Sequence, residues 1–201
     1  GYGTLTDLIL NNKPKKIYLV EKDNNLKNIL KKKYKMENRV NIIGSDILYL
    51  NLAKYKNLII FSNLPYNIST KIILYLFLFN KNISEMIFMI QKEVAEKFDY
   101  SLPNMNKYKF LTKILTSYKR CFDVSSKVFV PKPKVKSTVV KFKFKNKITD
   151  LKKANLFCKL IFRNIRKKIN NNIKTIKKID LLEKRVNELS INDLLRIYNF
   201  F

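Results

Sequence analysis

An amide, a proline and an aromatic ring come in quick succession after an apolar run of the chain. NLIIF at 57–61 predicts a buried strand, and SNLPYNIS at 62–69 begins where that strand should end. The side chain of Asn63 can both donate and accept hydrogen bonds, Pro65 stiffens the turn, and Tyr66 offers a flat aromatic face. These groups at this spacing predict a small clamp for a planar ligand with a hydrogen-bonding edge.

Glycines and acidic residues stand at the ends of the preceding predicted strands. GYGTLT places Gly1 and Gly3 before a predicted helix, where backbone N–H groups can approach an anionic or carboxylate group. Glu21 directly follows KIYLV, where an acidic side chain can accept hydrogen bonds from ribose hydroxyls. Asp46 lies just past VNII and can accept from an adenine amino group. Each residue alone also fits an ordinary turn, a solvated carboxylate or a helix cap, but the ordered set favours a nucleotide-like ligand.

The charge of the chain points to a polyanionic partner. It has 201 residues, with 42 Lys and Arg against 15 Asp and Glu, and a formal net charge of +27. A globular chain this basic most plausibly meets nucleic acid. The alternative is a coding bias, because abundant Lys, Asn and Ile with only 3 Gly and no Trp is also what AT-rich coding produces.

Residue types that are missing exclude several chemistries. The sequence contains no histidine, which rules out a His general base, a Ser-His-Asp triad and His-ligated metals. Cys121 and Cys158 are far apart and lack CxxC spacing, so we expect neither a disulfide framework nor a metal site. This cysteine usage fits a reducing compartment. No uninterrupted apolar stretch reaches membrane-spanning length.

The hydrophobic pattern predicts an α/β domain followed by a small helical domain. Apolar strands alternating with helices indicate a parallel sheet covered on both faces, while TVVKFKF alternates and suits an antiparallel or edge strand. We expect strands at 16–20, 40–43, 57–61, 86–90, 120–124 and 138–144, and helices at 4–11, 23–35, 69–79, 91–98 and 108–118. From residue 149 the sequence reads as helices, with Ser190 or Asn192 as an N-cap. The predicted domains are 1–148 and 149–201.

Several motifs in the same order carry a resemblance to a known family. SNLPYNIS, following the Gly/Glu/Asp series, resembles the ribosomal RNA adenine dimethyltransferase family, and VFVPKPKVKSTVV fits its F-x-P-x-P-x-V-x-S pattern. MIFMIQKEVAEKF, FRNIRKKINNNI and KRVNELSINDLLRIYN also resemble family segments, so the likeness covers nearly the whole chain. The resemblance implies a Rossmann-like S-adenosylmethionine-dependent methyltransferase domain with a small all-helical C-terminal domain.

The resemblance also implies roles for the clamp residues. The Asn63 side-chain oxygen and the Leu64 carbonyl would accept both protons of an adenine amino group, which turns its lone pair toward the methyl donor. Tyr66 would stack on one face of the extruded base and Phe129 on the other. No strong base is then needed, which agrees with the absence of histidine.

S-adenosylmethionine is the implied cofactor, held by Gly1, Gly3, Glu21, Asp46 and Asn63. The chain begins GYGTLT without Met, and we expect the family's first strand, its acidic residue and its first glycine to lie upstream.

Two basic segments are expected to bind RNA. Lys132, Lys134 and Lys136 alternate along an extended segment beside the expected active site. In the tail, further cations lie near one another on what we expect to be successive helical turns, and they would hold RNA phosphates: Arg163, Arg166, Lys167 and Lys168. A merely solvated basic face is the alternative.

One residue departs from the family pattern, and the sequence leaves several alternative functions. Lys109 stands where the family commonly has glycine after the tyrosine of YKFL. The implied activity is dimethylation of two neighbouring adenines in a 3′-end hairpin of small-subunit ribosomal RNA. The enzyme would be a monomer that needs no metal, and it would act in a bacterial cytoplasm or an organelle. The rivals are a macrolide-resistance methyltransferase acting on large-subunit RNA, a DNA adenine methyltransferase, and a non-catalytic ribosome-assembly or transcription factor.

Overall fold

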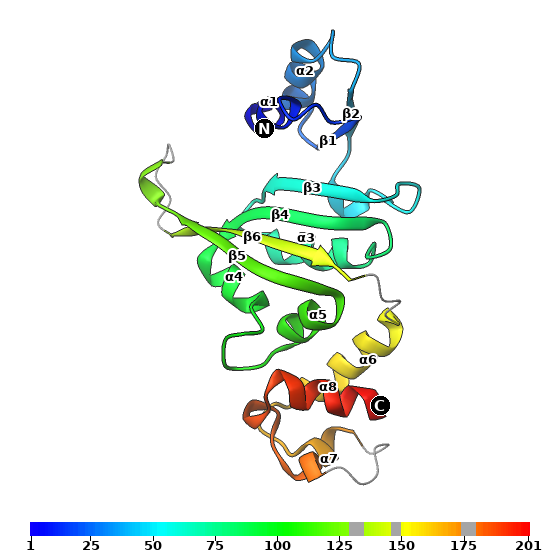
Figure 1. Cartoon of the computed structure of the whole chain (residues 1–201), viewed down its shortest axis with the longest axis vertical. Helices are drawn as coiled ribbons and strands as arrows, with labels where there is room; N and C mark the ends of the chain where they lie inside the picture. The colour runs from blue at the N-terminus through cyan, green and yellow to red at the C-terminus, as the bar shows by residue number, and fades with distance from the viewer. Residues whose placement is uncertain (129–134, 146–149, 174–179) are drawn as a thin grey trace. The chain divides into compact units, whose positions relative to one another are not determined.

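The computed structural model describes residues 1–128, 135–145, 150–173 and 180–201 (Figure 1). The chain divides into two compact units, residues 1–54 and residues 55–201. Each unit is described by itself below. The predicted domain boundary after residue 148 falls within 146–149, outside the described residues, and stays a prediction.

The first unit is a small α/β unit with a parallel strand pair. Its elements are α1 (Thr4–Leu10), β1 (Ile17–Glu21), α2 (Asn24–Lys33), β2 (Val40–Gly44) and the short 3-10 helix η1 (Ile47–Tyr49). The side chain of Asp23 caps α2 by accepting from the Leu26 N–H, at 2.9 Å. The expected strands and helices of this part are confirmed within a few residues. The register pairs Glu21 with Gly44, so β1 and β2 end side by side.

The second unit contains a four-stranded mixed sheet. Its strands are β3 (Leu58–Asn63), β4 (Ile83–Gln91), β5 (Thr116–Val124) and β6 (Ser137–Phe144), in the order β3-β4-β6-β5. β3 runs parallel to β4, whereas β6 is antiparallel to both β4 and β5, which confirms the prediction for TVVKFKF.

The described strands form two sheets, and Ile59 and Phe61 are exposed on one face of β3. One detail of the strand prediction is wrong. β5 begins at Thr116, where a helix was expected to continue, because Thr116 to Tyr118 pair with β6 and this ladder outweighs the local helical pattern.

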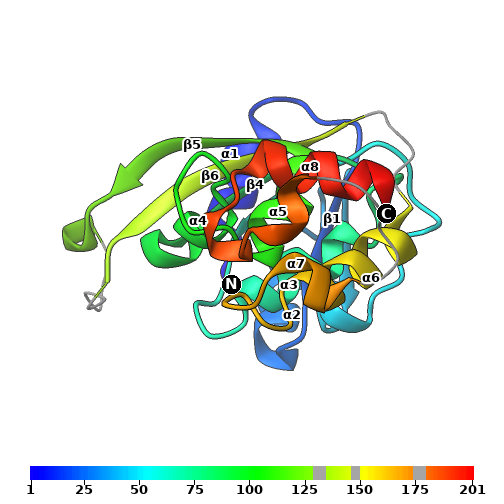
Figure 2. The same ribbon diagram turned by 90° about the horizontal axis from the view of Figure 1, so that it is seen from below.

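Three helices pack on one face of the four-stranded sheet (Figure 2). They are α3 (Ser69–Phe77), α4 (Lys92–Phe98) and α5 (Lys107–Leu115). Phe142 of β6 is fully buried and meets Phe77 of α3 and Phe98 of α4 edge-to-face, with ring centroids 5.9 Å and 5.7 Å apart. This aromatic core fixes the face of the sheet that the helices cover.

The described residues after Phe144 form helices and turns, with one isolated β-bridge between Lys168 and Arg185. The elements are α6 (Leu151–Ile161), α7 (Ile169–Asn172), η3 (Asp180–Glu183), η4 (Val186–Glu188) and α8 (Ile191–Phe200). Ser190 caps α8 in a capping box with Asp193, as predicted. Phe157 of α6 packs between Phe110 of α5 and Tyr198 of α8, at centroid distances of 4.9 Å and 5.1 Å, so the helical segment is attached to α5 by rings. In the described ranges, none of the helices is long and apolar enough to cross a membrane.

Candidate active site

The predicted clamp lies at the carboxyl end of β3. Asn63 is the last residue of this strand, is exposed, and pairs with Met89 of β4. The Leu64 N–H donates to the Met89 carbonyl at 3.1 Å, and the Leu64 side chain is buried. The Ile68 N–H donates to the Pro65 carbonyl at 3.2 Å and closes the turn. The amide of Asn63 and the backbone of Leu64 are therefore presented from a fixed strand end.

Tyr66 is held at two atoms. Its phenolic oxygen lies 2.7 Å from the Oγ of Ser137, and its carbonyl accepts from the Ser69 hydroxyl at 3.2 Å. Ser137 and Ser69 are both buried, so these contacts are protected from water. Ser137 was not singled out from the sequence, although it is the serine that ends the F-x-P-x-P-x-V-x-S pattern.

Of the other residues expected near the clamp, only Lys136 lies in the part of the chain that the structure describes. Phe129, Lys132 and Lys134 lie outside the described residues. Lys136 is exposed, and its carbonyl accepts from the Lys92 N–H at 2.9 Å. This bond continues the β4–β6 pairing by one residue toward the start of α4.

Two carboxylates meet at the carboxyl ends of the first unit's strands. Glu21 ends β1 and is paired with Gly44, and Asp46 follows Gly44 by two residues. The Oε1 of Glu21 accepts from the Asp23 N–H at 3.0 Å. This bond fixes the carboxylate at the strand end, where it can accept further hydrogen bonds.

Asp46 has a local role beside its predicted one. Its Oδ1 accepts from the Leu48 N–H at 3.0 Å and caps η1, and the Lys22 ammonium lies 3.9 Å from its Oδ2. The helix-cap alternative thus accounts for one oxygen of Asp46. The second oxygen has only the distant Lys22 contact among those described.

Gly3 is fixed by a network that sequence reasoning missed. It has a left-handed backbone, with φ 83°, and the Tyr34 hydroxyl donates to its carbonyl at 2.8 Å and also contacts Asp7 Oδ1 at 2.7 Å. The Lys33 ammonium binds Asp7 Oδ2 at 2.6 Å. These partners lie near residue 3 only through the fold, and no motif in the sequence connects them.

The charges of this network support one another. Hydrogen bonds from Lys33 and Tyr34 lower the pKa of Asp7, and the Asp7 carboxylate raises the pKa of Lys33. Burial, followed by the hydrogen bond to Asp7, raises the pKa of Tyr34. At neutral pH the pair is charged, Tyr34 keeps its proton, and the glycine turn stays tied to the end of α2.

The basic tail segment is exposed but not helical. Arg163, Arg166, Lys167 and Lys168 lie in the turns between α6 and α7, so the prediction of successive helical turns is wrong. The Asn172 side chain donates to the Ile161 and Asn164 carbonyls, at 3.3 Å and 3.1 Å, and anchors this segment. Lys168 is paired with Glu183 at 2.6 Å, which reduces its free charge.

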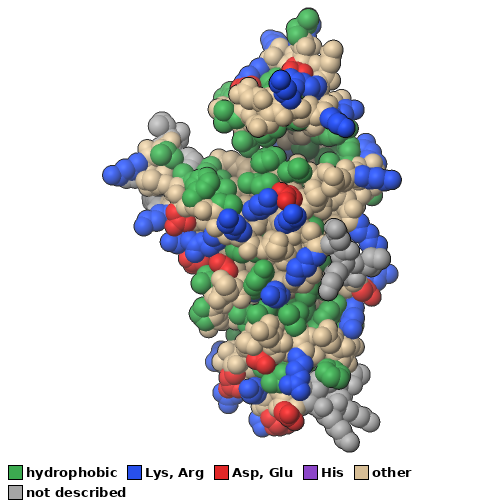
Figure 3. All heavy atoms as spheres, in the orientation of Figure 1, with side chains coloured by type: hydrophobic (Ala, Val, Ile, Leu, Met, Phe, Trp, Pro, Cys, Tyr) green, Lys and Arg blue, Asp and Glu red, His purple; other side chains and the backbone are tan. Residues whose placement is uncertain are grey.

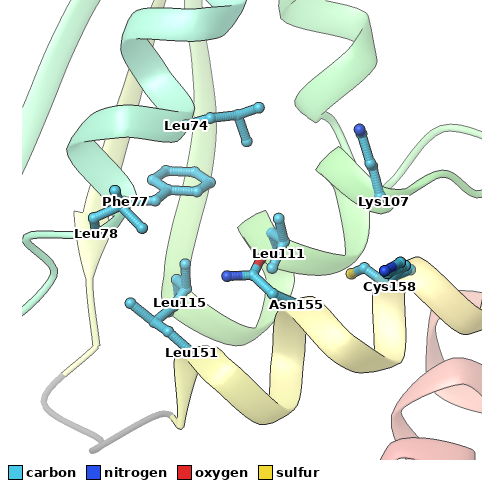
Figure 4. A pocket seen from close by; sticks show the side chains of 10 residues that line it. Leu74, Phe77, Leu78, Lys107, Leu111, Leu115, Leu151, Asn155 and Cys158 are labelled. Atoms are coloured by element: carbon cyan, nitrogen blue, oxygen red, sulfur yellow. The ribbon is translucent and has the colours of Figure 1, made fainter. Parts of the chain in front are cut away.

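A cavity of about 380 Å³ lies between α3, α5 and α6, away from the clamp residues (Figure 4). Its lining is mainly leucine side chains with Phe77, Asn155 and Cys158. Burial raises the pKa of the Cys158 thiol to about 12, so this thiol stays protonated and is a poor nucleophile. In the described part of the chain, no group of three or more His, Cys, Asp or Glu comes together as possible metal ligands.

Lys109, where the resemblance would place glycine, has a structural role. It is buried, and its ammonium donates to the carbonyls of Pro103 and, at 3.1 Å, Leu102. Burial lowers its pKa, and the nearby Asp99 and Glu96 carboxylates oppose that effect. The lysine ties the connection between α4 and α5 to the start of α5.

Comparison with known proteins identifies related chains and folds. The family described as "Ribosomal RNA adenine dimethylase" matches residues 1–201. The proteins named "Ribosomal RNA small subunit methyltransferase A" from Hydrogenobaculum sp. and Malacoplasma penetrans are each 34% identical to this chain; the matches cover 99% and 95% of this chain and 78% and 71% of theirs. Among solved structures, a dimethyladenosine transferase from Plasmodium falciparum aligns over 100% of this chain and 90% of its own, with TM-score 0.80 and 21% identity. The 23S rRNA methyltransferase ErmE aligns over 99% and 86%, with TM-score 0.79 and 16% identity.

The fold is the Rossmann-like methyltransferase fold of these two structures, with helices at the C-terminal end, as predicted. The chain belongs to the ribosomal RNA adenine dimethylase family. The predicted family and enzyme class are confirmed.

Proposed function

We propose that this protein transfers methyl groups from S-adenosylmethionine to the exocyclic amino groups of two neighbouring adenines in the 3′-end hairpin of small-subunit ribosomal RNA. Each adenine receives two methyls in succession. The relatives named as small-subunit methyltransferases support small-subunit RNA as the substrate, and the two hairpin adenines are what the family resemblance implies. The observation that carries the proposal is the clamp at the end of β3, where exposed Asn63, the fixed Leu64 backbone and the tethered ring of Tyr66 come together.

The clamp residues supply positioning rather than acid–base chemistry. An aromatic amine is a weak nucleophile because its lone pair is delocalised into the ring. Asn63 Oδ1 and the Leu64 carbonyl accept hydrogen bonds from the two amino N–H groups. The nitrogen then becomes more tetrahedral, and its lone pair is free to attack. Fixed dipoles and orientation of this kind can lower a barrier without a strong base.

The aromatic residues hold the target base outside its stack. Tyr66 stacks on one face of the extruded adenine, and the resemblance assigns the other face to Phe129. Base–aromatic stacking contributes about 1–3 kcal/mol per base. The hydrogen bond between the hydroxyls of Tyr66 and Ser137 supports this role, because it fixes the position and axis of the ring before the base arrives.

The first unit has hydrogen-bonding groups that suit S-adenosylmethionine. The Glu21 carboxylate suits the ribose hydroxyls, and the second oxygen of Asp46 suits an adenine amino group. Gly1 and Gly3 present backbone N–H groups to the carboxylate end, and Asn63 of the second unit is the further contact that the resemblance implies. When bound, the cofactor supplies an electrophilic methyl group.

The basic segments are proposed to hold the RNA. Lys132, Lys134 and Lys136 precede β6, and the tail turns carry a second group of exposed cations. Lys168 belongs to this group in the proposal, although Glu183 neutralises part of its charge. We further propose that the protein is a monomer and acts on the maturing small subunit in the cytoplasm.

A methyl-transfer assay on small subunits that lack these methyl groups tests the function. The wild type should label small-subunit RNA, and Asn63→Ala should lower the rate by at least about 100-fold, the scale of one preorganised hydrogen-bonding group. RNA binding should stay close to wild type. Asn192→Ala is the matched control, because Asn192 is also exposed but lies on α8.

The result that overturns the mechanism is equal activity of the Asn63→Ala variant. Methylation of large-subunit RNA instead of small-subunit RNA would favour the macrolide-resistance type of activity. RNA binding without any methyl transfer would favour the assembly factor.

A further inference from the structure

Ser137, the buried serine of the candidate active site, has neighbours that are held on both sides of it. The Lys136 carbonyl accepts from the Lys92 N–H at 2.9 Å, and the Thr138 hydroxyl donates to Asp123 Oδ1 at 2.8 Å. Ser137 and Thr138 are both fully buried. The start of β6 is therefore attached to the start of α4 and to the end of β5 by two separate bonds.

An ion pair closes these contacts into a ring. The Lys92 ammonium lies 3.3 Å from Asp123 Oδ2, so the two residues that hold the neighbours of Ser137 also hold each other. The ring joins three elements, because Lys92 begins α4, Asp123 lies in β5 and Ser137 begins β6. Figure 3 shows Asp or Glu side chains beside Lys or Arg side chains over this end of β5.

A β-bulge brings a second cation to Asp123. Arg120 Nη2 donates to Asp123 Oδ1 at 3.2 Å. Two side chains that are three positions apart on a regular strand point to opposite faces. The register shift at Cys121 inserts one extra residue, so Arg120 pairs with Val140 and Asp123 with Thr138 on the same face. The bulge thus lets both side chains meet.

The Asp123 carboxylate is charged and lies at the face of the sheet that the helices cover. Hydrogen bonds from Thr138 and Lys92, with a smaller contribution from Arg120, lower its pKa. A charged carboxylate only accepts hydrogen bonds, so the Thr138 hydroxyl must donate to it. Thr138 pairs with Ile90 of β4, which is fully buried on the helix-covered face. The ring is therefore made by contacts between the described residues themselves.

We propose that Asp123 and Lys92 are a positioning pair for the clamp, which holds the first residues of β6 so that the Ser137 hydroxyl keeps the Tyr66 ring in place. This inference rests on the proposed function, because it takes Tyr66 as the ring that stacks on the target adenine. Ser137 pairs with Val124 in the last pair of the β5–β6 ladder. The ends of such elements open more readily than their centres, and side-chain bonds beside the last pair oppose this opening.

The first test measures kcat and KM for methyl transfer to under-methylated small subunits. Asp123→Ala should lower kcat by about 3- to 10-fold, the scale of one hydrogen bond, and leave KM for RNA and for S-adenosylmethionine unchanged. Asp123→Asn keeps an oxygen to which Thr138 can donate, so it should recover part of the loss. In a Ser137→Ala background, Asp123→Ala should cause no further loss, because both changes free the same ring.

The second test needs no methyl transfer. A fluorotyrosine in place of Tyr66 gives a fluorine NMR signal whose position depends on the surroundings of the ring. Ser137→Ala should move this signal toward that of free fluorotyrosine. Asp123→Ala should move it in the same direction, and so should Thr138→Val, which keeps the size of the side chain but has no hydroxyl.

Glu93→Ala is the matched control, because it also removes a carboxylate from an ion pair and adjoins Lys92 in the sequence. The Glu93 carboxylate lies 3.0 Å from the Lys97 ammonium, within α4. The transfer rate and the fluorine signal of this variant should equal those of wild type.

Different results overturn the two proposals. A wild-type fluorine signal and a wild-type kcat in both Asp123→Ala and Thr138→Val overturn the positioning pair alone. An equal loss from Asp123→Ala with and without Ser137→Ala also overturns it, because the two residues would then act independently. Failure of the wild type to methylate small-subunit RNA overturns the proposed function, and the fluorine signal still decides whether the pair holds the ring.

Discussion

The hydroxyl groups of Tyr66 and Ser137 lie 2.7 Å apart and join the end of β3 to the start of β6. The two residues are 71 positions apart in the sequence, and Ser137 is fully buried. A hydrogen bond at the far end of a tyrosine ring holds the phenolic oxygen in place and so restricts the first side-chain torsion. The axis of the Tyr66 ring is therefore fixed before any ligand binds.

Ser137→Ala should slow methyl transfer without removing it. The variant leaves the ring in place but frees its orientation, so we expect kcat to fall about tenfold, the equivalent of one hydrogen bond of about 1 kcal/mol or slightly more. Tyr66→Phe should cause a similar loss, and the double variant should be no worse than either single one, since both remove the same bond. Single-turnover kinetics on under-methylated small subunits measures these rates.

Ser117→Ala is the control for these single and double variants. Ser117 is exposed on β5 and lies at the opposite end of the β5–β6 ladder from Ser137. Additive losses in the double variant would show that the Tyr66–Ser137 bond does not act as a unit.

Gly3→Ala should weaken both the first unit and its use of the methyl donor. The left-handed backbone at Gly3 costs other residues about 1–2 kcal/mol, and a Cβ there would overlap the Tyr34 hydroxyl. We expect the free energy of unfolding to fall by at least that amount and KM for S-adenosylmethionine to rise. Thermal unfolding and initial rates measure the two effects.

Gly44→Ala is the matched control for this substitution. A Cβ at Gly44 meets only the far end of the flexible Lys27 side chain, which can move away. If Gly3→Ala bound the methyl donor as tightly as Gly44→Ala, the glycine turn would have no part in cofactor binding.

The elements that could be predicted from the sequence are those with strong local patterns. Continuous apolar runs and capping residues located β1, β2 and β3, and the Ser190 cap located the start of α8. Motif spacing placed Asn63, Leu64 and Tyr66 at a strand end, where the structure has them.

The features that could not be predicted depend on contacts between distant residues. The start of β5 at Thr116 is set by pairing with Phe144, and a bulge at Cys121 shifts the register further along the same ladder. The bond between Tyr34 and Gly3 joins residues 31 positions apart. Local propensity contains no information on such pairings, so a helix was expected where the strand begins.

The Asp7–Lys33 pair should make the first unit sensitive to acid. The folded pKa of Asp7 is lowered, so its contribution to stability is present above the ordinary carboxyl pKa of about 3.9 and is lost as pH falls through the lowered value. Asp7→Asn should be less stable than wild type at neutral pH, and the difference should shrink below about pH 4. Thermal unfolding across a pH series measures it.

Lys32→Met is the control for charge on α2, because Lys32 is exposed and adjoins Lys33. Its stability relative to wild type should not change with pH over this range. A difference between wild type and Asp7→Asn that stays constant from pH 7 to pH 3 would contradict the role of the ion pair.

Removal of single cations in the tail should change the salt dependence of RNA binding unequally. Arg166→Ala and Lys167→Ala each remove an exposed charge, so each should weaken binding to all RNA sequences and reduce the slope of log K against log salt by about 1. Lys168→Ala should reduce the slope less, because the Lys168 ammonium lies 2.6 Å from a Glu183 carboxylate oxygen and already has a partner. Binding titrations at a series of salt concentrations measure the three slopes. If all three variants kept the wild-type slope, these turns would be a solvated basic surface and the RNA contacts would lie elsewhere.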